Sequence, residues 1–519
     1  MGKVVSVQEA LALIPNGATV CVGGFIGSMH PEALTSALET QFLETGAPRD
    51  LTLVCSAGQG DTKDRGVNHF GHEGLLKCMI GGHFALAPKV QALALAGKIQ
   101  AYNFPQGVIS HLFRDIAAKK PGVITHIGLH TFVDPRLEGG KLNPQTTEDR
   151  IELIELDGHE YLLYKSFPID IALVRATYAD PNGNATFERE AMSLEVLAMA
   201  QAAHNSGGKV ILQVERVVEP GTLNTQLIKL PGICVDAIVE APPELHMQTF
   251  GTQYNPAFAG SIRVPVHAIT PLPMGERKII ARRCAMELVP YAVTNLGIGM
   301  PEGVSIAANE EGLSDELVLT VEAGAIGGVP AGGLDFGAAT NADCIIDQPA
   351  QFDFYHGGGL DLGILGLAQV DAAGNVNVSK FGPKIAGCGG FIDITQTAKR
   401  LVYCGTFTAG GLKIEIKNGE LHIVQEGKVK KFIHTLEQIT FSGAYAAELG
   451  QDVLYVTERA VFRLTPDGLV LTEIAPGVDL ERDILAQMEF SPIVPDTIPL
   501  MDARLFLEPP MGLKAERSR

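Results

Sequence analysis

Apolar and β-branched residues come in short runs along this chain, and glycines follow most of these runs before a helix-like segment begins. Residues 19–24 (TVCVGG), 51–58 (LTLVCSAG) and 317–324 (LVLTVEAG) show the pattern. Such runs are typical of buried strands, and their alternation with helices predicts an α/β fold with mainly parallel sheets. From about residue 401, apolar and polar residues alternate around Asn-Gly and Asp-Gly pairs, which predicts antiparallel hairpins at the C-terminus. Residues 477–488 (GVDLERDILAQM) then predict a closing helix.

The second half of the chain repeats the pattern of the first half in three places. Residues 14–34 resemble 289–304, residues 49–58 resemble 315–324, and residues 179–187 resemble 370–378. In the first pair a Pro-Glu dipeptide opens a helix after a glycine turn, and proline is best tolerated in the first helical turn. Because the three echoes occur in the same order, we expect two tandem α/β domains, 1–255 and 276–519. A linker rich in proline and glycine, 256–275, would join them.

One carboxylate stands where an apolar strand is expected to end. The run 317–321 leads directly to Glu322 and then to a glycine-rich turn. A carboxylate there is costly to bury, so it either caps the strand and points into water or has a chemical use. The repeat aligns Glu322 with Ser56, and ligands of open α/β sheets gather beyond the carboxyl ends of the strands. Glu322 is therefore a candidate for chemistry.

Composition limits the partners and the compartment. The chain has 519 residues, 46% of them hydrophobic, with a mean hydropathy of +0.16 and a formal net charge of −19. These values fit a folded protein of at least two domains and disfavour binding to nucleic acid or to anionic membranes. The eight cysteines show no CxxC spacing, so we expect buried free thiols, among them Cys21 and Cys344, in a reducing compartment. We expect no signal peptide and no membrane span, and so a cytoplasmic protein.

Eight stretches that together span nearly the whole chain resemble one enzyme family. They are NGATVCVGGFIGSMHPE, GHEGLLKCMIGGH, AYNFPQGVISHLFRD, GLHTFVDPRLEGGKLN, VEAGAIGGVPAGG, GGLDLGILGLAQVDAAGNVNVSKFG, IAGCGGFIDITQ and YVTERAVFRLTPDGL. On these motifs the chain resembles family I CoA-transferases, most closely the single-chain propionate/acetate branch. Two positions depart from family signatures: Met29 stands where glycine is usual, and VEAG (321–324) replaces the Ser-Glu-Asn-Gly of the ketoacid branch. These departures leave the acyl specificity undefined, but the glutamate of the signature is kept as Glu322.

The resemblance implies a NagB/RpiA/CoA-transferase-like fold in each half, a homo-oligomer (dimer or tetramer), and a set of site residues. Glu322 would be acylated during turnover, and the Gln106 side chain and the backbone N–H of Gly390 would flank the reacting carbonyl as oxyanion donors. From the residues alone, Gln106 is equally well a surface amide, and GCGG (387–390) is equally well an ordinary tight turn.

Further binding residues are expected in the glycine turns. By the resemblance, the first turn borders the acyl pocket, with Gly24, Phe25 and Met29. The turn LGIGMPEG (296–303) joins a strand to a helix, so its amides and the helix N-terminus are candidates for holding an anion of CoA, and half of such turns are merely structural. The residues expected to contact CoA are Gly297, Gly299 and Gly389.

Transfer of CoA from a thioester to a free carboxylate is expected to follow a ping-pong mechanism with covalent intermediates. Both nucleophiles, the carboxylate and the CoA thiolate, are already anionic. No general base is needed, no metal-ligand spacing is present, and CoA is a substrate and not a cofactor. The expected partners are acyl-CoA and short-chain carboxylates. Two alternatives stay open: a short-chain acyl-CoA hydrolase, and a non-catalytic sensor of small acids or CoA esters on the same fold.

Overall fold

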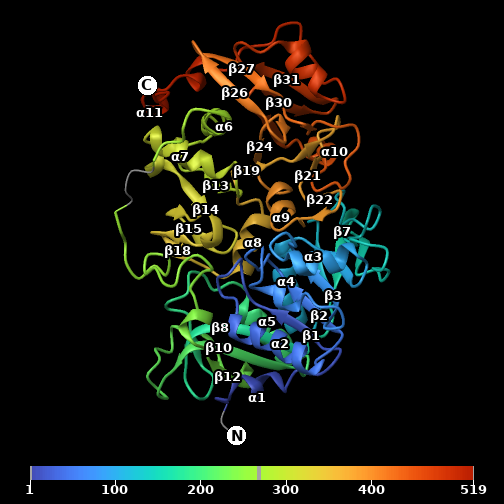
Figure 1. The fold of residues 1–519 in the computed structure, drawn as a ribbon, viewed down its shortest axis with the longest axis vertical. Helices are drawn as coiled ribbons and strands as arrows, with labels where there is room; N and C mark the ends of the chain where they lie inside the picture. The colour runs from blue at the N-terminus through green and yellow to red at the C-terminus, as the bar shows by residue number, and fades with distance from the viewer. Residues whose placement is uncertain (1–2, 266–269, 518–519) are drawn as a thin grey trace. The chain divides into compact units, whose positions relative to one another are not determined.

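The computed structural model describes residues 3–265 and 270–517, which form two compact units (Figure 1). Unit 1 comprises Met1–Val264, Val321–Phe354 and Lys380–Asp393, and unit 2 comprises Pro265–Thr320, Tyr355–Ser379 and Ile394–Arg519. The units therefore do not follow the sequence halves, because two segments of the second half belong to unit 1. The domain bounds 1–255 and 276–519 stay a prediction about the repeat, and residues 266–269 of the predicted linker lie outside the described residues.

Unit 1 is built on a mainly parallel sheet with the order β11-β9-β8-β1-β2-β3-β4, in which β8 also pairs with β10, and β10 with β12. The parallel strands are β1 (Thr19–Val22), β2 (Leu51–Cys55), β3 (Leu76–Gly81), β4 (Gln100–Asn103), β8 (Ile171–Ala179), β10 (Lys209–Val217) and β12 (Ala237–Glu240). The short strands β9 (Ala185–Thr186) and β11 (Ile228–Leu230) are antiparallel. Val20, Leu53 and Leu173 on these strands have no exposed surface, as expected for apolar runs buried on both faces.

Helices and smaller sheets complete unit 1. The helices are α1 (Val7–Leu11), α2 (Glu32–Thr45), α3 (Pro88–Leu95), α4 (Gln106–Ala117) and α5 (Val196–Asn205), with the start of α8 (Gln348–His356) and of α9 (Phe391–Thr395). A separate antiparallel sheet has the order β5-β7-β6, from Gly122–Thr125, His159–Lys165 and Ile151–Leu156. Antiparallel pairs join β15 (Ala325–Ile326) to β18 (Cys344–Ile345), β16 (Val329–Pro330) to β17 (Ala339–Thr340), and β22 (Lys380–Phe381) to β23 (Lys384–Ile385).

Unit 2 contains the sheet order β14-β13-β19-β24-β29-β30-β31. Its parallel strands are β14 (Val318–Thr320), β13 (Val293–Leu296), β19 (Leu362–Gly366), β24 (Arg400–Cys404) and β29 (Asp452–Val456), and β30 (Ala460–Thr465) and β31 (Gly468–Ile474) follow as antiparallel strands. The helices are α6 (Glu276–Ala285), α7 (Glu302–Glu310), α10 (Gly443–Glu448) and α11 (Leu513–Arg517). Antiparallel pairs join β20 (Gln369–Val370) to β21 (Val376–Asn377), β25 (Thr408–Ala409) to β28 (Val429–Lys430), and β26 (Lys413–Lys417) to β27 (Glu420–Gln425).

The predicted α/β class, the mainly parallel sheets and the C-terminal hairpins are confirmed. The β26–β27 hairpin turns at Asn418 and Gly419, whose φ angles of 55° and 80° suit an Asn-Gly turn. The predicted closing helix at 477–488 is found as a shorter helical segment that is not an α-helix: residues Leu480–Ile484 are π-helical, and Leu485–Gln487 follow directly as a 3-10 turn. Asp479 caps this segment by accepting a hydrogen bond from the Arg482 N–H, so the helical segment begins there.

The sequence repeat has a structural counterpart in two turns. In unit 1, Asp180 Oδ1 accepts hydrogen bonds from the N–H groups of Asn182 and Asn184, at 2.9 and 3.0 Å. In unit 2, Asp371 Oδ1 accepts bonds from the N–H groups at the same offsets, Ala373 and Asn375, both at 3.0 Å. In both turns the asparagine four residues after the aspartate, Asn184 or Asn375, also donates from its side chain to the other aspartate oxygen. The echo in the sequence therefore encodes one turn geometry twice.

The eight cysteines are all free thiols in the part of the chain that the structure describes. Cys21 is buried as expected, but Cys344 is exposed, because it lies on the two-residue strand β18 and not inside a core strand. No helix within residues 3–265 and 270–517 is long and apolar enough to cross a membrane.

Candidate active site around Glu322

Glu322 lies in a tight turn that begins where β14 ends. The Val321 N–H donates to Ala325 O at 2.8 Å, and the Gly324 N–H donates to Val321 O at 2.9 Å, so the turn closes around the glutamate. Gly324 has a φ of 116°, and a Cβ atom there would lie 2.0 Å from Ile346 O. Only glycine therefore fits at this position. The turn holds the Glu322 side chain in one direction at the end of the strand.

The Glu322 carboxylate lies directly against the backbone at Gly390. A Cβ atom on Gly390 would lie 1.8 Å from Glu322 Oε2 and 3.6 Å from Phe352 Cζ. The carboxylate thus occupies the space that any side chain at 390 would need. Among the described residues, no group donates a hydrogen bond to either oxygen of Glu322, so the carboxylate is available to react.

Burial, followed by repulsion from the Asp393 carboxylate, raises the pKa of Glu322 to about 8. Both causes disfavour the charged form. At pH 7 only about a tenth of such a group is ionised, and most of it is ionised at pH 9. Strongly raised pKa values of this kind are concentrated at functional sites.

Gln106 lies beside the same loop. It is the first residue of α4, is 2% exposed, and donates its backbone N–H to Gly389 O at 2.9 Å. Its side-chain Nε2 is enclosed and has no hydrogen-bond partner among the described residues. A Cβ atom on Gly389 would lie 4.0 Å from Gln106 Oε1. Unit 1 therefore brings Glu322, Gln106, Gly389 and Gly390 together, and the amide of Gln106 is a buried donor that lacks an acceptor.

Two residues that sequence reasoning missed hold this loop in place. Asn103, at the end of β4, accepts a hydrogen bond from the Cys388 N–H at 2.9 Å and donates to Gly81 O and Gly82 O at 2.8 and 2.6 Å. Asp393 accepts the Gly107 N–H at 3.1 Å and so ties the loop to the start of α4. Asn103 immediately precedes FPQG (104–107), and Asp393 comes three residues after GCGG (387–390). The sequence did single out these two motifs, but neither motif shows which loop Asn103 and Asp393 would bind.

His83 is a further, partly buried residue at this site. Its Cδ2 would lie 3.9 Å from a Cβ on Gly389, and its Nδ1 would lie 2.7 Å from a Cβ on Gly58. Burial lowers the pKa of His83 to about 4, so the ring is neutral at pH 7. Its enclosed Nδ1 has no partner within the described ranges.

A second buried carboxylate, Glu195, is hydrogen-bonded to Ser56, the residue that follows β2. Ser56, which the repeat aligns with Glu322, donates its hydroxyl to Glu195 Oε1 at 2.5 Å. Burial raises the pKa of Glu195 to about 7. Gly82 lies between Ser56 and Gln106, because a Cβ on it would lie 2.0 Å from Ser56 O and 3.5 Å from Gln106 Cα. The two strand ends that the repeat aligns therefore carry Ser56 in the first half and Glu322 in the second half, and both residues belong to unit 1.

The predicted acyl-pocket residues lie in the turn after β1. A Cβ on Gly24 would lie 2.7 Å from Gln59 Oε1, and Met29 is fully buried with a φ of 60°. The Phe25 ring lies 5.8 Å from the Phe336 ring, centroid to centroid. These contacts pack the turn inside unit 1 without bringing any of the three against Glu322, so their role at the acyl group stays a prediction.

The predicted CoA turn, 296–303, belongs to unit 2. Gly297 follows β13, and a Cβ on it would lie 3.0 Å from Leu365 Cδ2. Gly299 has a φ of 84°, and its carbonyl accepts a hydrogen bond from Arg277 at 3.0 Å. The turn leads into α7, as expected. Its role in binding CoA stays a prediction.

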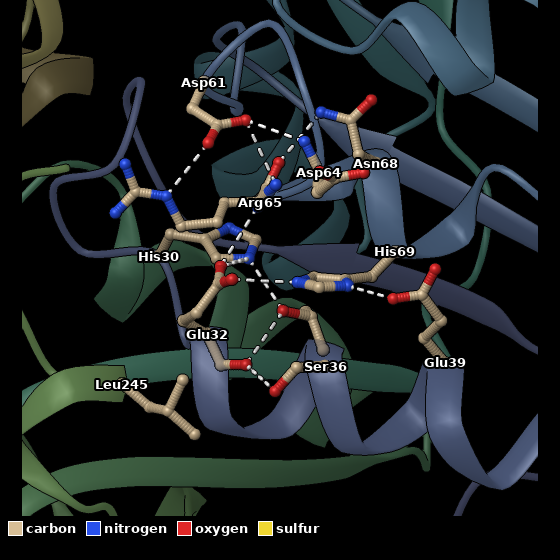
Figure 2. A network of polar contacts seen from close by, with 12 residues as sticks. His30, Glu32, Ser36, Glu39, Asp61, Asp64, Arg65, Asn68, His69 and Leu245 are labelled. Atoms are coloured by element: carbon tan, nitrogen blue, oxygen red, sulfur yellow. Dashed lines mark hydrogen bonds and ion pairs between the residues drawn. The ribbon is translucent and has the colours of Figure 1, made fainter.

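Histidine and glutamate side chains near the start of α2 form a hydrogen-bonded chain (Figure 2). His69 bridges Glu32 and Glu39, at 2.8 and 2.5 Å, and His72 also reaches Glu39, at 2.6 Å. Burial lowers the pKa of His69, but the hydrogen bonds and negative charges of Glu32 and Glu39 together outweigh burial, so the pKa is raised. No group of side chains among the described residues has the arrangement of a metal site. These histidines therefore fix the start of α2.

The Asp393→Asn variant tests the cause of the raised Glu322 pKa. Asparagine keeps an oxygen that accepts the Gly107 N–H but removes the negative charge, so we expect the pKa of Glu322 to fall. The measurement is the pH dependence of kcat/KM for an acyl-CoA, whose midpoint should move to lower pH. Glu155→Gln, the same change of charge on an exposed strand residue, is the control. An unmoved midpoint in Asp393→Asn would contradict the assignment.

Comparison with known proteins identifies the family. The coenzyme A transferase family model matches residues 4–241. The chain is 48% identical over 510 residues to the acetate CoA-transferase YdiF of Escherichia coli K12, covering 98% of this chain and 96% of that protein. It is also 48% identical over 519 residues to caffeate CoA-transferase of Acetobacterium woodii, covering 99% of both chains. A solved structure of the E. coli O157:H7 acyl-CoA transferase YdiF, described as a thioester complex with CoA, superposes with a TM-score of 0.93 at 47% identity, covering 98% of this chain and 97% of that chain.

These comparisons define the class of the protein as a transferase that acts on acyl-CoA. With the relatives above, the chain belongs to the coenzyme A transferase family, and the expected single-chain CoA-transferase is confirmed at this level.

Proposed function

We propose that this enzyme transfers CoA reversibly from a short-chain acyl-CoA to a free short-chain carboxylate, by a ping-pong reaction through Glu322. The observation that carries the proposal is the Glu322 carboxylate, which has no hydrogen-bond donor among the described residues and lies against Gly390 beside the buried amide of Gln106. Relatives at 48% identity bear the names acetate and caffeate CoA-transferase, which supports an acyl-CoA and a free carboxylate as the two substrates.

The reaction proceeds through two covalent states of Glu322. Its carboxylate attacks the thioester carbonyl, a C–O bond forms, the C–S bond breaks, and the products are an acyl-glutamyl anhydride and CoA thiolate. The thiolate then attacks the glutamyl carbonyl of the anhydride, which releases the first acid and leaves a glutamyl-CoA thioester. The incoming acid runs these steps in reverse. The relative described as a thioester complex with CoA supports the second state.

Each step passes through a tetrahedral oxyanion, and two donors border Glu322. They are the backbone N–H of Gly390 and the Nε2 of Gln106, both held by the loop contacts of Asn103 and Asp393. A donor that lacks an acceptor in the resting site costs no rearrangement when the oxyanion forms. Removing one such donor typically lowers the rate by about 10²–10³.

The raised pKa of Glu322 fits this chemistry. Burial and the Asp393 charge both disfavour the glutamate anion. The anhydride and the thioester carry no charge on this side chain, so the same forces favour their formation. The site therefore weakens the resting carboxylate and stabilises its covalent products.

The finer assignments come from the family resemblance and from the glycine turns of the sequence, and they are part of this proposal. Gly24, Phe25 and Met29 border the acyl group, and Gly297, Gly299 and Gly389 approach CoA, which is a substrate held covalently and not a resident cofactor. We expect a cytoplasmic homo-oligomer, a dimer or a tetramer, that needs no metal.

Trapping of the covalent state tests the proposal. The enzyme is incubated with propionyl-CoA and then with borohydride, which reduces a glutamyl thioester to an alcohol, and its peptides are mapped by mass spectrometry. We expect one modified side chain, Glu322. A separate reaction of acetyl-CoA with propionate should form propionyl-CoA. Free CoA without propionyl-CoA would show a hydrolase, and an unmodified Glu322 would overturn the mechanism.

A further inference from the structure

His83 is a polar ring beside the Glu322 site that the proposed reaction leaves without a role. It follows Gly82, whose carbonyl accepts the Gly389 N–H at 2.7 Å, so its backbone is fixed against the glycine loop of the site. The ring lies between two glycines: a Cβ on Gly58 would lie 2.7 Å from its Nδ1, and a Cβ on Gly389 would lie 3.9 Å from its Cδ2. His83 and both glycines belong to unit 1, as Glu322 does.

The space in front of Gly389 is large enough for one further atom. A Cβ built there would meet no atom nearer than 3.9 Å, with His83 Cδ2 at that distance and Gln106 Oε1 at 4.0 Å. Both are ordinary van der Waals distances. At the next residue, Gly390, the corresponding place is already occupied by the Glu322 carboxylate. Of two consecutive glycines, one therefore faces the nucleophile and the other leaves an atom-sized place between the imidazole and the amide.

The surroundings of the ring determine which nitrogen carries its hydrogen. The Nδ1 is enclosed and has no partner, and the ring makes no other hydrogen bond to the residues that the structure describes. An enclosed N–H without an acceptor is rarer than an enclosed acceptor without a donor, so we assign the hydrogen to Nε2. His83 is partly exposed, and its Nε2 is bonded to the Cδ2 that faces Gly389. The ring therefore presents an N–H donor on the side of the open place.

A neutral donor suits this position better than a cation. The acid substrate is an anion, and Asp393 is a further anion near Glu322. A lysine or arginine here would attract the acid, but it would also lower the pKa of Glu322 and stabilise the resting carboxylate against acylation. Burial lowers the pKa of His83 to about 4, so at neutral pH the ring donates a hydrogen bond without carrying a charge.

We propose that His83 binds the free acid: its Nε2–H donates to one carboxylate oxygen, while the other oxygen attacks the glutamyl carbonyl of Glu322. The inference rests on the proposed function, which supplies the glutamyl-CoA thioester and the acid. In the reverse direction the same N–H holds an oxygen of the departing acid as negative charge develops on it. Gln106 and Gly390 remain the donors to the tetrahedral oxyanion, and His83 recognises the carboxylate group that all acid substrates share.

The test uses the enzyme with CoA already bound to Glu322 as a thioester. Enzyme treated with propionyl-CoA is freed of small molecules and mixed with propionate, and the rate of propionyl-CoA formation is measured against propionate concentration. We expect His83→Phe, a flat ring without a donor, to raise the half-saturating propionate concentration about 10- to 100-fold, the range of one hydrogen bond to a charged group. His83→Gln, whose amide N–H can reach the position of Nε2, should recover most of this loss.

Hydroxylamine is a second nucleophile, and it carries no carboxylate. Its nitrogen attacks the glutamyl carbonyl, the C–S bond breaks, and a proton of the amine passes to the CoA thiolate, so CoA is released. The rate of this release should agree within twofold between His83→Phe and the wild type. His159→Phe, the same change at an exposed histidine of β7, is the matched control and should alter neither reaction.

The two nucleophiles separate binding of the acid from support of the loop. A half-saturating propionate concentration within twofold of the wild type in His83→Phe would overturn this inference alone. An equal loss with hydroxylamine would also overturn it, because the ring would then only hold the glycine loop in place. A wild type that forms no thioester on Glu322 would overturn the proposed function and this inference together.

Discussion

Glu322→Gln is expected to abolish CoA transfer, with kcat/KM for propionyl-CoA falling by more than about 10⁴, the scale of removing a nucleophile. The amide has the shape of the protonated glutamate and fits the space against Gly390, but its carbonyl oxygen is too weak a nucleophile to open a thioester. The rate of propionyl-CoA formation from acetyl-CoA and propionate measures this loss. Borohydride should then label no peptide.

The same variant should also differ from the wild type in thermal stability. A cooperative melting transition of Glu322→Gln would show that the inactive variant is folded. The folded pKa of Glu322 is about 8 against an ordinary value of 4.5, so below pH 4.5 the glutamate is protonated in both states and carries no penalty. As pH rises from 4.5 to 8, the unfolded state ionises first and the wild type loses stability relative to the variant. Glu322→Gln should therefore melt at a higher temperature than the wild type at pH 8–9 and at a similar temperature at pH 4.5.

Glu322→Asp is the matched control, because it keeps the carboxylate and draws it back by one methylene. We expect intermediate activity, since a displacement of about 1 Å can cost about 10² in rate. Transfer at the native rate by Glu322→Gln, or an equal melting temperature of Glu322→Gln and wild type at pH 9, would contradict the role of this side chain or its raised pKa.

The strand ends and the repeat could be predicted because local residues determine them. Apolar runs followed by glycine, Pro-Glu helix starts, and the Asp180 and Asp371 turns depend on neighbours within a few positions. Glu322 was identifiable for the same reason, as a carboxylate after a buried strand. The helix predicted at 477–488 is shorter than expected and is not α-helical, because its apolar period does not show that the backbone changes from π-helical to 3-10 after residue 484.

The contacts that make the site could not be predicted, because they join segments far apart in the chain. Asn103 reaches Cys388 across 285 positions, and Asp393 reaches Gly107 across 286. Sequence motifs locate the loops, and only the fold shows which loops meet.

Gly390→Ala should reduce transfer nearly as much as the loss of Glu322, although it removes no functional group. The added Cβ would stand 1.8 Å from Glu322 Oε2, so the carboxylate must swing away from the Gly390 N–H that is proposed to hold the oxyanion. Misplacing the nucleophile and the donor together should lower kcat/KM by at least about 10² and by as much as about 10⁴.

Gly275→Ala is the matched control for this prediction, because a Cβ there meets nothing within 4 Å and the φ of 164° is extended backbone. It should transfer CoA at the native rate. The contact also predicts how Gly390→Ala fails: Glu322 moves out of its enclosed place, so its pKa should fall towards the ordinary value, and the residual activity should peak at lower pH than in the wild type. Residual activity with an unchanged pH profile would mean that the alanine disturbs only the oxyanion donor and leaves the carboxylate where it is.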